Sequence, residues 1–142
     1  MAYAIINNDQ LYKIASDDAA KTNLNLNESD YTVINISDAQ FNKLKKEEAY
    51  ITGSGGSYSV TDCEDIYHPV SEEDMKQKIN EVVKDFEYFI VDHENHSMID
   101  DIHNYIAFLK GIDTSSLTYP MSQSFYDYVE SQSQTVISPL QV

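Results

Sequence analysis

The sequence predicts an α+β fold, with a small antiparallel sheet in the N-terminal half of the chain. An antiparallel helix pair plus a short third helix are expected in the C-terminal half. Two features predict this: β-branched runs bounded by turn residues come first, and two apolar stripes at helical spacing come later. We therefore expect a β-rich lobe at 1–62, a connector at 63–70 and a helical lobe at 71–142, together forming one compact unit.

The first two apolar runs of the chain predict a β-hairpin over residues 2–15. Between them, Asn7–Gln10 provides turn residues, because Asn and Asp tolerate a left-handed backbone. Ser16 is then expected to cap a short helix over Asp17–Thr22. The polar stretch 23–30 predicts a loop.

The clearest strand signal is Tyr31–Ile36, which is rich in β-branched residues. A helix over Ser37–Glu48 should follow, with Gln40 completing a capping box at its start. Residues 49–60 are expected to form two strands around the glycine-rich run Gly53–Ser57. No Lys follows these glycines, so a hairpin loop is favoured over a phosphate-binding loop.

The strongest helix signal is an apolar stripe within Ser71–Ile90, whose members recur every three or four residues. The stripe consists of Met75, Ile79, Val82, Phe86 and Phe89, widened by Val83 and Ile90. Ser71 and Asp74 form a variant of the capping box, and acidic residues fill the first turn, where the helix dipole favours them. We expect this helix to be the core of the chain.

A second helix is expected to begin at a capping box formed by Ser97 and Asp100, and to run to Leu109 before Gly111 closes it. On one unbroken helix, the second apolar stripe would face away from the first. A break at Asp92–His96 is therefore predicted, which lets the two helices pair antiparallel around one core.

The C-terminal segment carries shorter signals. Ser122–Ser131 predicts a short helix with Phe125, Tyr128 and Val129 on its apolar side. Thr135–Ile137 is expected to form a last strand.

The charge of the chain limits the classes of partner. The formal net charge is −15, from 24 acidic residues against 9 basic ones, all of them Lys. Direct nucleic-acid binding is not expected, because phosphates need cations. No apolar run is long enough for a membrane span, and the N-terminus does not have the pattern of a signal peptide. The single cysteine, Cys63, excludes an intramolecular disulfide.

Candidate chemistry is confined to a segment rich in histidine and acidic residues. His93, His96, Asp100 and His103 could hold Zn²⁺ or Mn²⁺, although their spacing does not follow the HExxH pattern. A polar turn between two helices is the favoured interpretation. No catalytic or cofactor-binding motif appears, so we expect a protein that is not an enzyme and needs no cofactor.

Three segments give the chain a resemblance to small proteins of tailed bacteriophages. They are YTVINISDAQFNKL at Tyr31–Leu44, the strand and glycine loop at Tyr50–Tyr58, and HNYIAFLKGID at residues 103–113. The layout resembles that of tail-fibre assembly proteins and tail-assembly chaperones, in which a later helix carries a Trp-x-x-Tyr-Arg-x-x-Leu pattern. Here Tyr105 and Leu109 match that pattern, whereas Ile102 and Ile106 replace the Trp and the Arg.

The resemblance implies a tail or virion structural component, or a tail-fibre assembly factor, that acts through protein–protein contacts. Its partners would be other phage structural or tail proteins, or further copies of itself. It would work in the host cytoplasm during assembly or remain in the virion. An acidic mimic of nucleic acid that inhibits a basic host protein, and a metal-dependent enzyme using the three histidines, stay open as alternatives.

The predicted contact surface is an aromatic-rich stretch near the C-terminus, since aromatic residues and Met are enriched at interfaces. It comprises Tyr119, Met121, Phe125, Tyr126 and Tyr128. The alternative is that these side chains form the core of the C-terminal lobe.

Overall fold

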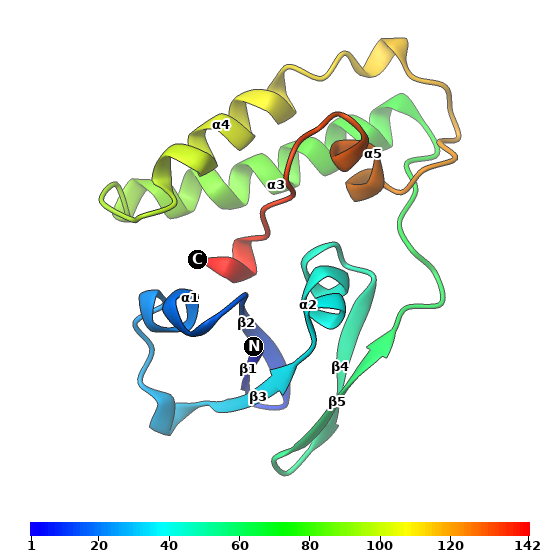
Figure 1. Cartoon of the computed structure of the whole chain (residues 1–142). Coiled ribbons are helices and arrows are strands. Elements are labelled where there is room, and N and C mark those ends of the chain that lie inside the picture. Colours follow the sequence, from blue (N-terminus) through cyan, green and yellow to red (C-terminus); the bar gives the residue numbers. More distant parts are fainter. The chain divides into compact units, whose positions relative to one another are not determined.

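The computed structural model describes residues 1–142, and its α+β class confirms the prediction (Figure 1). It contains two small antiparallel sheets, ordered β2-β1-β3 and β4-β5, and the helices α1 to α5. The chain divides into two compact units, and the end of the first at Ile66 falls inside the predicted connector. The first unit is Met1–Ile66 with Leu140–Val142, and the second is Tyr67–Pro139.

The first unit begins with the predicted hairpin. β1 (Ala2–Asn7) pairs antiparallel with β2 (Gln10–Ala15). The turn residues Asn8 and Asp9 have φ values of 52° and 63°, the left-handed conformation that two-residue hairpin turns require. β1 lies at the centre of the sheet, because β3 (Thr32–Ile36) pairs antiparallel with its other edge.

Two short helical elements lie between β2 and β3. α1 (Asp18–Asn23) is capped by Asp17, whose carboxylate accepts a hydrogen bond from the Ala20 N–H at 2.8 Å. The predicted cap at Ser16 is therefore wrong by one residue, because the longer Asp side chain occupies the capping position. A 3₁₀ turn, η1 (Glu28–Asp30), follows within the predicted loop.

A helix and a second hairpin complete the core of the first unit. α2 (Asp38–Lys45) begins with the predicted capping box, in which both hydrogen bonds between Ser37 and Gln40 form. β4 (Ala49–Ser54) and β5 (Ser57–Asp62) pair antiparallel, which confirms the glycine-rich hairpin. Their side chains join those of β1, β2 and α2 in one apolar cluster, built on Ala2, Ala4, Ile14, Ile36, Phe41, Leu44 and Ala49, with Ile51, Val60 and Leu140 packed against it.

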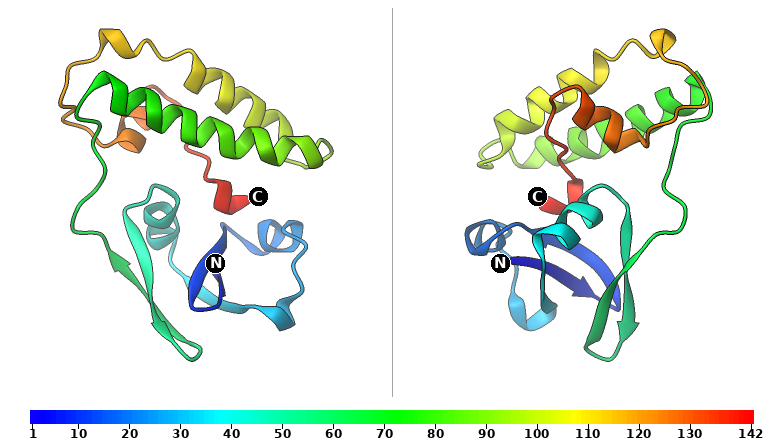
Figure 2. Two further views of the ribbon diagram at one scale, coloured as in Figure 1. Left: turned by 180° about the vertical axis from the view of Figure 1, so that it is seen from behind. Right: turned by 45° about the vertical axis from the view of Figure 1, so that its right-hand side comes forward.

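The second unit is built on a helix pair. α3 (Glu72–Asp92) and α4 (Ile99–Lys110) lie side by side in both views of Figure 2, joined by a short turn, and are antiparallel. Ser71 caps α3 as predicted, accepting a hydrogen bond from the Asp74 N–H at 3.2 Å. Most members of the predicted stripes are buried, namely Met75, Ile79, Val82, Val83 and Phe86 on α3 and Ile102, Ile106 and Leu109 on α4. Phe89, Ile90 and Ile99, which are also expected to face inward, are half-buried, and Tyr105 is an additional buried residue of α4.

The start of α4 differs from the prediction. The break at 92–96 is confirmed, but Ser97 does not cap the second helix. The N-cap residue is Met98, with φ −95° and ψ 7°, and no side chain caps the helix from that position. A serine placed one residue too early cannot reach the N–H groups of the first turn.

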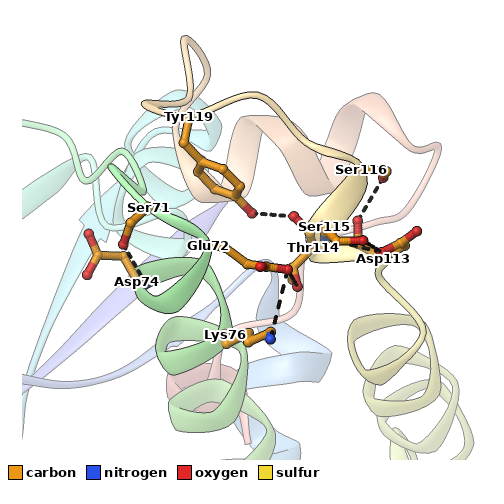
Figure 3. Close-up of polar contacts among 9 residues, drawn as sticks. All are labelled: Ser71, Glu72, Asp74, Lys76, Asp113, Thr114, Ser115, Ser116 and Tyr119. Carbon is orange, nitrogen blue, oxygen red and sulfur yellow. Dashed lines mark hydrogen bonds and ion pairs between the residues drawn. The ribbon is translucent and has the colours of Figure 1, made fainter.

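After α4 the chain folds back along the second unit. A 3₁₀ turn, η2 (Thr114–Ser116), is attached to the start of α3, because the Thr114 hydroxyl donates to Glu72 Oε2 at 2.8 Å (Figure 3). α5 (Phe125–Ser131) confirms the predicted short helix, with Ser124 as its cap. The predicted last strand at 135–137 does not form, since no neighbouring strand is available in this unit for hydrogen bonding.

Candidate functional site

The turn between α3 and α4 is organised by two histidines that pack on one aromatic ring. His93 stacks on Phe89 with the ring centroids 4.1 Å apart and the planes within 4°. His96 meets the same ring edge-on, with centroids 5.3 Å apart. The end of α3 and the turn therefore share a small aromatic cluster.

The hydrogen bonds of His93 and His96 show that Nδ1 is protonated in one imidazole and not in the other. His93 Nδ1 donates to the Phe89 carbonyl oxygen at 2.8 Å, so this nitrogen carries a proton. His96 Nδ1 accepts from the Met98 N–H at 3.0 Å, so this nitrogen carries none. Burial lowers the pKa of His96 below its usual value, and the nearby His93 lowers it further. A neutral His96 therefore provides the acceptor that the N-cap of α4 does not obtain from Ser97.

The four metal-ligand candidates do not gather around one point. No group of three or more His, Cys, Asp or Glu side chains in the structure is arranged to hold a metal ion. His93 and His96 each use Nδ1 within the turn, whereas Asp100 and His103 lie on the outer side of α4. His93 and His96 pack on Phe89 and not around a common point with Asp100 and His103.

A groove lies between the outer sides of α3 and α4, next to this turn. It has a volume of about 530 Å³ and is open to solvent. Its apolar lining, called its floor below, consists of the half-buried Ile90 and Ile99 and the exposed Val91. Its polar rim consists of Glu87, Glu94, Asp100 and His103.

The rim of this groove has two carboxylates without a cation. Glu87 is paired with Lys110 across the helices, with Nζ and Oε2 3.2 Å apart. Glu94 and Asp100 form no ion pair within the chain. The groove beside the α3–α4 turn therefore combines apolar lining residues with acidic ones.

The apolar surface continues past the groove along α3. Val91 is 71% exposed and Tyr88, one turn earlier on the helix, is 67% exposed. Large apolar side chains that lie together on a surface mark sites of interaction more often than single ones do. We call the exposed pair Tyr88 and Val91 the apolar strip of α3.

No family model, curated protein or solved structure matches this chain. Its function is therefore argued from its own residues and geometry. None of its helices combines the length and the apolar character that crossing a lipid bilayer requires.

A second, larger hollow follows the N-terminal half of α3 and has a different character. Its volume is about 740 Å³, and its lining is wholly polar or charged: Glu72, Glu73, Lys76, Gln77, Asn80, Glu81 and Lys84. No apolar residue lines this open helix face, so it differs from the groove in the type of side chain that it presents. It serves as an internal control for the strip.

The predicted contact residues near the C-terminus are mostly internal. Met121, Phe125 and Tyr126 are buried, with Phe125 and Tyr126 packed edge to face at 5.0 Å. Tyr119 and Tyr128 are half-buried, and the Tyr119 hydroxyl donates to the Thr114 carbonyl at 2.8 Å (Figure 3). Their main visible role is packing within the second unit, and only the two half-buried tyrosines present part of their surface to solvent.

Sequence reasoning missed the apolar strip, although a signal for it was present. Tyr88 and Val91 lie on α3 but far from its buried stripe, and a solvated helix face is usually polar there. Apolar residues outside a strong stripe could have been noted as candidates for contact.

Proposed function

We propose that the protein is a bacteriophage protein that acts through protein–protein contacts, as a tail or virion component or as a tail-fibre assembly factor. Its partners would be other phage structural or tail proteins, which it would meet in the host cytoplasm during assembly. The observation that carries the contact role is the exposed apolar strip beside the groove, including Val91 at 71% exposure.

The strip suits protein contact better than small-molecule chemistry. The groove that Val91 lines is open to solvent, whereas sites for small molecules usually enclose most of the ligand surface. Tyr is among the residues that contribute most binding energy at protein interfaces, and Tyr88 of the strip is exposed. The phage assignment is supported by the sequence resemblance at 31–44, 50–58 and 103–113.

Affinity capture from the cells in which the chain is naturally made tests this proposal. We expect tagged protein to recover virion or tail polypeptides, identified by mass spectrometry. Replacing Tyr88 and Val91 together by Ser should reduce their recovery about tenfold, since exposed anchors dominate binding energy.

A matched control replaces Tyr50 and Val70 by Ser, because these are also an exposed Tyr and an exposed Val. That variant should recover the same polypeptides as the wild type. Recovery of the protein alone, or of the same partners by both double variants, would contradict the proposal.

A further inference from the structure

The chemistry of the groove indicates the kind of partner segment that it accepts. We propose that it binds an amphipathic helical segment of a second protein, whose apolar side chains are flanked by Lys or Arg. This inference rests on the proposed contact function and adds the partner's charge and shape.

The apolar lining of the groove favours a partner with apolar side chains. Ile90, Val91 and Ile99 are branched aliphatic residues from two antiparallel helices, so they form a furrow that runs between them. Peptide helices bind such furrows by inserting side chains spaced three and four residues apart. Burial of aliphatic surface from both partners would favour the complex.

The carboxylates of the rim favour a partner that carries cations. Glu94 and Asp100 have no cation partner, and both lie where the helices are joined, Glu94 in the turn after α3 and Asp100 in the first turn of α4. Glu87 already has Lys110. A segment with cations beside its apolar anchors would pair with the two remaining carboxylates, whereas an acidic segment would be repelled.

The same charges disfavour a second copy of this chain as the occupant. The formal net charge is −15, and acidic residues exceed Lys in both halves of the sequence. Self-association through the groove would therefore add acidic surface to an acidic rim. A partner of opposite charge fits the groove better.

Two synthetic peptides test the inference with the full-length protein. Both are amphipathic helices of about four turns with the same Leu face, and one carries Lys and the other Glu beside that face. In titrations followed by fluorescence anisotropy, the Lys peptide should bind about tenfold more tightly than the Glu peptide. Its affinity should fall as salt is raised, because the ion pairs remain partly exposed.

Variants assign the binding to the groove. Combining Glu94→Gln with Asp100→Asn should weaken the Lys peptide about fourfold, and Val91→Ser should also weaken it. Combining Glu73→Gln with Glu81→Gln removes the same charge from the polar hollow of α3 and should change nothing. Circular dichroism checks that each variant keeps its helical content.

The outcomes separate this inference from the proposed function. Equal binding of both peptides, no binding, or no effect of the Glu94 and Asp100 changes would overturn the inference. If capture of phage polypeptides still depended on Tyr88 and Val91, the contact function would survive that result. Selective binding of the Lys peptide without any captured phage partner would support the inference and contradict the phage assignment.

Discussion

At the scale of single residues, His96 links protonation to the start of a helix. Its Nδ1 accepts the Met98 N–H, and burial lowers its pKa in the folded chain. In the unfolded chain the imidazole should titrate near its ordinary pKa of about 6.5. As the pH falls below that value, the unfolded chain takes up the proton first, so the free energy of unfolding decreases until the folded pKa is passed.

His96→Asn tests this link, because the Asn Oδ1 can replace Nδ1 as an acceptor but does not titrate. On acidification from about pH 7.5 to 5.5, the melting temperature of the wild type should fall further than that of the variant, because the lowered pKa of His96 makes only the wild type lose stability through this side chain. Thermal unfolding followed by circular dichroism measures both. Parallel pH profiles for the two proteins would show that His96 has no such role.

Phe125 and Tyr128 are two aromatic residues of α5 with different surroundings. Phe125 is fully buried against Tyr126, whereas Tyr128 is half-buried. Phe125→Ala should therefore lower the free energy of unfolding by about 3–5 kcal/mol. Tyr128→Ala should lower it by about 1 kcal/mol. Urea unfolding of both variants distinguishes packing from surface, and equal losses would mean that Phe125 is not a core residue.

At the scale of elements, the helix caps show how far a local pattern can be trusted. Ser71 and Ser97 both stand three residues before an Asp, yet only Ser71 bonds to the N–H of that residue. The pattern is local, whereas the backbone angles at a helix start also depend on what precedes it. Near Ser97, His93 and His96 pack on Phe89 and His96 accepts from the Met98 N–H, whereas no side chain caps the first turn of α4.

Two alanine substitutions measure this difference. Ser71→Ala should lower the free energy of unfolding by about 1 kcal/mol, the usual contribution of an N-cap hydrogen bond. Ser97→Ala should change it by less than about 0.5 kcal/mol, because the exposed hydroxyl caps nothing. Chemical denaturation of both proteins gives the comparison. A larger loss at Ser97 than at Ser71 would reverse our assignment of the caps.

Most helices and strands could be predicted from the sequence, because the spacing of apolar residues reflects which face of an element is buried. The apolar stripes of α3 and α4 can face one core only if the helix is broken between them. Asn8 and Asp9 tolerate the left-handed backbone that a two-residue hairpin turn needs. The strand expected at 135–137 failed for a physical reason. Val136 and Ile137 are indeed buried, but burial of apolar residues does not provide a neighbouring strand.

At the scale of the whole molecule, function depends on surfaces that the strongest sequence patterns do not describe. Periodicity identifies which residues are buried, but the residue types near the C-terminus predict a contact surface of which Met121, Phe125 and Tyr126 are in fact buried. The groove joins side chains of α3 and α4 that become neighbours only when the helices pair. Its acidic character depends on ion pairing that the sequence does not reveal. Glu87 is paired with Lys110, whereas Glu94 and Asp100 are not paired.

Photo-crosslinking from within the apolar strip tests the central claim most directly. A photoreactive amino acid replaces Val91 in the full-length protein, and a second protein carries it at Gln77, which lies in the polar hollow of the same helix. Both are irradiated in the cells that naturally make the chain. We expect a crosslinked virion or tail polypeptide from position 91 and none from position 77. No adduct at position 91, or the same adducts at both positions, would contradict the account.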